Sequence, residues 1–129
     1  MFALVAVASG AMLLWPLVQK VMSGVSEIGT LDATRLINRN NALLLDLRET
    51  KEFEGGKLPN AVHVPLSQLK ERGSELARFT KRPVIAYCAR GNTSRAAGAT
   101  LKQLGFAEIY QLQGGLQGWK SAGLPLETI

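Results

Sequence analysis

Cysteine and histidine are scarce in this chain: its 129 residues contain one of each, Cys88 and His63. A single cysteine excludes a disulfide within the chain and any metal site built from several thiolates. One cysteine with one histidine is too few ligands for an ordinary metal centre, so we expect no metal. A single free thiol is also typical of a reducing compartment. Any thiol chemistry must therefore use Cys88.

Runs of basic residues are also missing. The 15 Lys and Arg exceed the 10 Asp and Glu to give a formal net charge of +5, yet Lys81-Arg82 is the only adjacent basic pair. Nucleic-acid binding requires basic side chains gathered on one face. The dispersed pattern therefore predicts no nucleic-acid partner.

Charge is absent altogether from Met1 to Val18. As a helix this stretch would be about 27 Å long, close to the lower limit for crossing a bilayer core of about 30 Å. No basic residue precedes Lys20, which favours an uncleaved anchor over the alternatives of a cleavable signal peptide or a buried core helix. We expect residues 1–22 to form a single-pass helix in the inner (cytoplasmic) membrane. The basic residues that follow it place the remaining domain in the cytoplasm.

After a short polar joint at residues 23–26, helical and extended patterns alternate. Thr30 is expected to cap a helix that Asn40-Asn41 ends, and residues 66–79 are expected to form a helix broken near Gly73. Short apolar runs predict the strands, namely Ala42–Leu45 ending in Asp46, Ala61–Val64, Val84–Tyr87 and Glu108–Leu112. This alternation predicts one α/β domain with a parallel sheet and helices on both faces.

Cys88 follows the strand 84–87 and opens a loop that leads to a helix of small residues beginning at Arg95. Backbone N–H groups of such a loop, and the positive end of the following helix dipole, favour an anion at the loop centre. The setting therefore favours a nucleophilic thiolate, with an inert buried cysteine as the alternative. Asp46 ends another strand, and ligands of open parallel sheets gather at the carboxyl ends of the strands.

Three motifs resemble those of rhodanese domains, over about residues 27–129. The first runs from Leu44-Leu45-Asp46-Leu47-Arg48 through Glu52-Phe53 and Gly56–Ala61 to Val64-Pro65. The second is the loop Cys88–Thr93, and the third comprises Gly114-Gly115, Trp119 and Ala122-Gly123-Leu124-Pro125. The chain is similar to single-domain bacterial rhodaneses that carry a membrane anchor, with residues 23–26 as the linker.

The resemblance implies a central, mostly parallel five-stranded sheet and a sulfurtransferase that needs no metal or organic cofactor. Cys88 would take sulfane sulfur from thiosulfate or another small donor and pass it, through a persulfide, to cyanide, a thiol or a protein acceptor. Asp46 and Arg48, with Arg95, would support the site. The backbone N–H groups that would hold the terminal sulfur belong to Ala89, Arg90, Gly91, Asn92, Thr93 and Ser94.

The sequence departs from the family pattern at Ala89, where many members have Arg, and at Lys57, where they have His. These differences leave a persulfide as an alternative donor to thiosulfate. Phosphatase chemistry would need five residues between the cysteine and an oxyanion-binding arginine, whereas six separate Cys88 from Arg95. A non-enzymatic alternative is a membrane-tethered binding or scaffold module that keeps the rhodanese fold without turnover.

Overall fold

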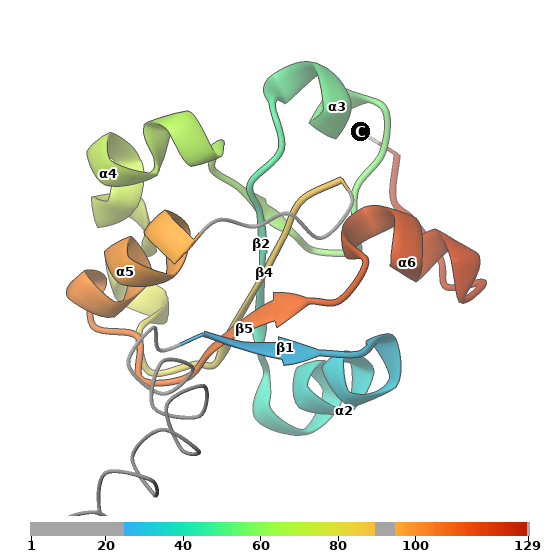
Figure 1. Cartoon of the computed structure of the whole chain (residues 1–129), viewed down its shortest axis with the longest axis horizontal. Coiled ribbons are helices and arrows are strands. Elements are labelled where there is room, and N and C mark those ends of the chain that lie inside the picture. The colour runs from blue at the N-terminus through green and yellow to red at the C-terminus, as the bar shows by residue number, and fades with distance from the viewer. Residues whose placement is uncertain (1–24, 90–94, 129) are drawn as a thin grey trace, which may run out of the picture.

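A five-stranded sheet forms the centre of the computed structural model, which describes residues 25–89 and 95–128 (Figure 1). The strand order is β1-β5-β4-β2-β3, and every pairing between these strands is parallel. The strands are β1 (Val25–Ile28), β2 (Leu43–Asp46), β3 (Val62–His63), β4 (Val84–Tyr87) and β5 (Ile109–Leu112). The predicted α/β class with a parallel sheet is therefore confirmed.

Helices cover both faces of this sheet. On one face α2 and α6 contribute Ala33 and Trp119 to a buried apolar cluster, and on the other α4 and α5 contribute Leu69 and Leu101 to a second cluster. Figure 1 shows these two helical layers on either side of the strands. The helical elements are α2 (Thr30–Asn40), α3 (Thr50–Glu54), the 3-10 turn η1 (Leu66–Gln68), α4 (Leu69–Arg72), the 3-10 segment η2 (Gly73–Phe79), α5 (Arg95–Leu104) and α6 (Gly115–Ser121).

Strand β4 is buried along its whole length because it lies at the middle of the sheet. Val84 and Ala86 pack in the α4/α5 cluster, while Ile85 and Tyr87 pack in the α2/α6 cluster. Alternate residues of a strand point to opposite faces, so a continuous apolar run is required where both faces are covered. The register then aligns Asp46 of β2 with Tyr87 of β4 on one side and His63 of β3 on the other. Three polar residues thus lie side by side at one end of the sheet.

Two local predictions were wrong. Val25 and Ser26, which we expected in a linker, belong to β1, where Val25 pairs with Ile109. This edge strand exposes its polar residues and so lacks the apolar run of a central strand. Thr30 begins α2 instead of capping it, because Gly29 occupies the N-cap position without a side-chain hydrogen bond.

Other boundaries agree more closely with the expectation. Asn41 ends α2 in the left-handed conformation, with φ 54°, which asparagine tolerates better than most residues. The segment 66–79 divides into η1, α4 and η2, and the last division falls at Gly73. A Cβ at Gly73 would lie 3.0 Å from side-chain carbons of Leu104, so a larger residue here would press on that side chain of α5.

The predicted anchor, residues 1–22, lies outside the described residues. None of the helices within 25–89 and 95–128 combines the length and the apolar character needed to cross a bilayer.

Candidate active site

The backbone at Cys88 is held by the start of α6. The carbonyl oxygen of Cys88 accepts a hydrogen bond from the Leu116 N–H at 2.9 Å, and that of Ala89 accepts one from the Gln117 N–H at 3.1 Å. Gly114, with φ 75°, allows the chain to turn from β5 into this helix. The only thiol of the chain therefore leaves the central strand at a fixed position, and it is half-buried.

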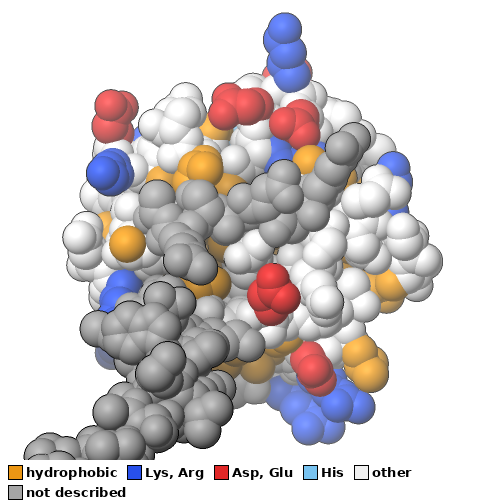
Figure 2. All heavy atoms as spheres, viewed as in Figure 1, with side chains coloured by type: hydrophobic (Ala, Val, Ile, Leu, Met, Phe, Trp, Pro, Cys, Tyr) orange, Lys and Arg blue, Asp and Glu red, His pale blue; other side chains and the backbone are white. Residues whose placement is uncertain are grey.

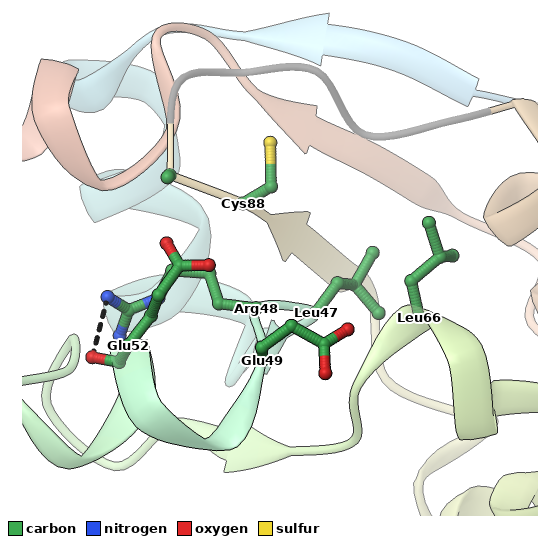
Figure 3. A pocket seen from close by; sticks show the side chains of 7 residues that line it. Leu47, Arg48, Glu49, Glu52, Leu66 and Cys88 are labelled. Atoms are coloured by element: carbon green, nitrogen blue, oxygen red, sulfur yellow. Dashed lines mark hydrogen bonds between the residues drawn. The ribbon is translucent and has the colours of Figure 1, made fainter.

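A pocket of about 260 Å³ opens beside this thiol (Figure 3). Its walls come from the carboxyl end of β2, the start of α3, η1 and the end of β4. The lining residues are Leu47, Arg48, Glu49, Glu52, Leu66, Cys88 and Ala89. The arrangement places a nucleophilic side chain in an accessible recess at the carboxyl ends of parallel strands, where such sheets bind ligands.

Behind the pocket, a buried carboxylate joins β2 to β4. Asp46 is fully buried, and its Oδ2 accepts hydrogen bonds from the Tyr87 hydroxyl at 2.7 Å and from Arg48 Nη2 at 2.8 Å. Its Oδ1 accepts from the backbone N–H of Arg48 at 2.9 Å and from Arg48 Nε at 3.1 Å. A buried ion is tolerated only when its charge and its lone pairs are satisfied, and here both conditions are met.

The guanidinium of Arg48 extends this network into the chain that follows. Nη1 donates to the carbonyl oxygen of Glu52 at 3.2 Å, and Nη2 donates to that of Gly56. Burial lowers the pKa of Arg48, but the hydrogen bond and the charge of Asp46 outweigh this effect and raise it overall. Arg48 therefore stays charged and ties the α3 segment to β2.

Tyr87, the residue before Cys88, completes the network as a neutral phenol. Burial first, then the charge of Asp46 and the hydrogen bond to it, raise the pKa of Tyr87 well above its usual range. Its oxygen also accepts a hydrogen bond from the Leu58 N–H at 3.2 Å. Tyr87 thus links the carboxyl end of β4, next to Cys88, to both β2 and the segment before β3.

His63 supports the same region from β3. Its Nε2 lies 2.8 Å from the carbonyl oxygen of Arg48, and its ring stacks on Phe53 with centroids 4.1 Å apart. His63 is half-buried and is not among the residues that line the pocket. The geometry is that of a supporting side chain between α3 and β3.

Of the predicted site residues, Cys88 and Ala89 line the pocket, and Asp46 and Arg48 form the network behind it. Arg95 begins α5. The loop residues Arg90, Gly91, Asn92, Thr93 and Ser94 lie outside the described residues. Tyr87, Glu49 and Glu52 were not predicted as site residues, although Glu52 lies in the first of the three motifs. The available signal was their position: Tyr87 directly precedes the cysteine, and the two glutamates lie three and six residues after Asp46, which ends β2.

Comparison with known proteins agrees with this geometry. The Rhodanese-like domain family matches residues 30–122. The uncharacterized protein YqhL of Bacillus subtilis is 46% identical over 78 residues, which are 60% of this chain and 60% of that protein. The thiosulfate sulfurtransferase GlpE of Actinobacillus succinogenes is 35% identical over 103 residues, 80% of this chain and 91% of that protein.

A solved structure shows the same fold. The crystal structure of a rhodanese-related protein from Thermoplasma volcanium superposes with a TM-score of 0.70 and 32% identity, covering 81% of this chain and 99% of the other. The family match over residues 30–122 spans β2, β4 and the residues that line the pocket. The chain belongs to the rhodanese-like domain family.

Proposed function

We propose that this chain is a sulfurtransferase that carries sulfane sulfur as a persulfide on Cys88. The observation that carries the proposal is the position of Cys88, which lines a pocket at the carboxyl end of the central strand. Family membership and the similarity to proteins named thiosulfate sulfurtransferase support the reaction class.

The reaction divides into two nucleophilic displacements. The Cys88 thiolate attacks the outer sulfur of thiosulfate, the S–S bond of the donor breaks, and sulfite leaves with the electron pair. Cyanide or an acceptor thiolate then attacks the outer sulfur of the persulfide, and the electron pair of the broken S–S bond returns to Cys88 Sγ. Each step is a covalent transfer with an activated cysteine as carrier. A small persulfide can replace thiosulfate as donor by the same displacement.

The intact mass of the full chain tests this proposal directly. Incubation with thiosulfate, or with a small persulfide, should add the mass of one sulfur atom, and cyanide should remove it. The Cys88→Ser variant is the matched control and should gain nothing. If neither donor adds sulfur to the wild-type protein, the chain is a rhodanese-fold binding module without turnover.

The sequence also supports a location for this activity. Residues 1–22 contain only one charged side chain, Lys20, which fits a tether in the inner membrane with the domain on the cytoplasmic side. The full chain should remain in the membrane fraction after an alkaline wash, and its Cys88 should be accessible to a membrane-impermeant thiol reagent only from the cytoplasmic side. Release by the wash would disprove the tether.

A further inference from the structure

Two carboxylates stand at the mouth of the Cys88 pocket. Glu49 precedes α3 and Glu52 lies in its first turn, and both are exposed and line the pocket. Figure 3 shows the Glu52 side chain rising from α3 toward the end of β4 that carries Cys88. Any molecule that reaches the sulfur through this opening passes these two charges.

The cation of the pocket lining is ion-paired with another carboxylate. Arg48 forms a salt bridge of 2.8 Å with Asp46, in which both side chains are almost fully buried. Asp46 therefore offsets the charge of Arg48, and Glu49 and Glu52 carry the remaining charges of the described residues that line the pocket. Within the described residues, neither glutamate carboxylate forms a hydrogen bond or an ion pair, and Glu49 provides no side-chain cap to α3.

The rest of the opening is apolar. Leu47 is buried, whereas Leu66 keeps 38% of its surface exposed, and both line the pocket with the two glutamates. A volume of about 260 Å³ admits a small organic molecule, since a cavity of about 150 Å³ already binds benzene. The surface therefore suits a short methylene chain that ends in a positive charge, because the methylenes contact leucine and the cation meets carboxylate.

We propose that Glu49 and Glu52 make this pocket selective for thiol acceptors that carry a positive charge close to the sulfur. The proposal rests on the proposed persulfide chemistry and names its acceptor class. The acceptor thiolate attacks the outer sulfur of the Cys88 persulfide, a new S–S bond forms on the acceptor, and the Sγ–S bond breaks to return the thiolate. The cation interacts with the glutamates both before and during the attack, so the selectivity appears in the second-order rate constant.

The test compares three thiols of similar size that differ in charge: cysteamine, 2-mercaptoethanol and 3-mercaptopropionate. The full chain is loaded with sulfur, its mass is checked, and the loss of the sulfur is followed by stopped-flow sampling and mass spectrometry, with rates expressed per thiolate. Cysteamine should react about tenfold faster than 3-mercaptopropionate at low salt, and the ratio should shrink at high salt because the charges are solvent-exposed.

The variant Glu49→Gln/Glu52→Gln should reduce that ratio at least about threefold. A merely structural effect of the substitutions would slow all three thiols alike and leave the ratio unchanged. Glu54→Gln, which changes an exposed glutamate of the same helix outside the pocket lining, is the matched control and should keep the wild-type ratio.

Two further arms identify the source of the acceptor. The rate of sulfur transfer per thiolate is measured for a cysteine peptide flanked by lysines and compared with the rate for cysteamine. A faster peptide indicates a protein acceptor, and a faster cysteamine indicates a small-molecule acceptor. Equal rates for cysteamine and 3-mercaptopropionate, or a faster anionic thiol, would overturn the proposal. Failure of the proposed function is seen separately, because the protein would then gain no sulfur before any thiol is added.

Discussion

Removing the Tyr87 hydroxyl should destabilise the protein strongly, although the substitution deletes a single atom. In the wild-type protein this hydroxyl donates to Asp46 Oδ2 at 2.7 Å and accepts from the Leu58 N–H at 3.2 Å, and all of these groups are buried. Tyr87→Phe removes a hydrogen bond to a charged group, worth about 1.5–3 kcal/mol, and leaves the Leu58 N–H without its partner at about 1–3 kcal/mol. Because these contributions overlap, we expect a loss of about 2–4 kcal/mol.

The same substitution should alter the pH dependence of stability. The pKa of Tyr87 is raised in the folded protein, so the unfolded chain loses this proton first as the pH rises. The stabilisation by the neutral phenol is complete below the unfolded pKa of about 10 and falls above it, by up to about 1.4 kcal/mol per pH unit. Tyr87→Phe should lack this part of the alkaline decline.

Urea unfolding followed by circular dichroism, at neutral pH and in steps above pH 10, measures both effects. Tyr110→Phe is the matched control, because its hydroxyl donates to Glu108 at 3.3 Å in an exposed pair. The control should lose less than about 0.5 kcal/mol at neutral pH. If Tyr87→Phe loses no more than this control, the buried network does not stabilise the fold as we have argued.

Three other substitutions test separate parts of the structure by thermal or urea unfolding. Arg48→Ala leaves the Asp46 carboxylate buried without its cation and should destabilise by about 3–5 kcal/mol; a loss below about 1 kcal/mol would contradict the buried ion pair. Gly118→Ala places a Cβ 2.8 Å from the Gln113 carbonyl oxygen, so it should cost about 1–3 kcal/mol and shift α6, and unchanged stability would show that α6 has room to move. Gly29→Ser should stabilise by about 0.5–1 kcal/mol, because Gly29 is an extended N-cap where a Cβ would make only an ordinary contact, 3.9 Å from Gln113 Oε1, and a decrease would refute this capping geometry.

The central strands could be predicted from sequence because burial on both faces leaves a continuous apolar run. Val84–Tyr87 was predicted with its observed bounds, and the run ending in Asp46 differs by one residue at its start. The edge strand β1 could not be recognised in the same way, because Ser26 and Glu27 face solvent and no periodic signal survives in four residues. Strand prediction therefore succeeded for the central strands, because burial on both faces favours apolar residues at successive positions.

In the candidate site, too, the residues marked by a local sequence pattern were predicted and the others were not. Cys88 and Asp46 were predicted as site residues because each lies at the end of an apolar run, and the topology of a parallel sheet brings such ends together. The Tyr87 hydroxyl was not foreseen, because its partner Asp46 lies 41 residues earlier in the chain and becomes its neighbour only through the β2–β4 register. Glu52 was named only within the first rhodanese-like motif, and its place in the pocket lining depends on where α3 lies in the folded chain.

The strand order also has a consequence for how the chain folds during synthesis. Among the described residues β1 pairs only with β5, so Val25, in the first of these strands to leave the ribosome, meets Ile109 of the last one. The β2–β4 pairing can form earlier, but the other edge of β4 stays unpaired until β5 has been synthesised. Contacts between segments so far apart in sequence slow folding because the chain entropy must be lost before the pairing is gained. The N-terminal strand must therefore wait, unpaired, until β5 has been synthesised, and a chaperone that shields short exposed strands should raise the yield of correctly folded chain.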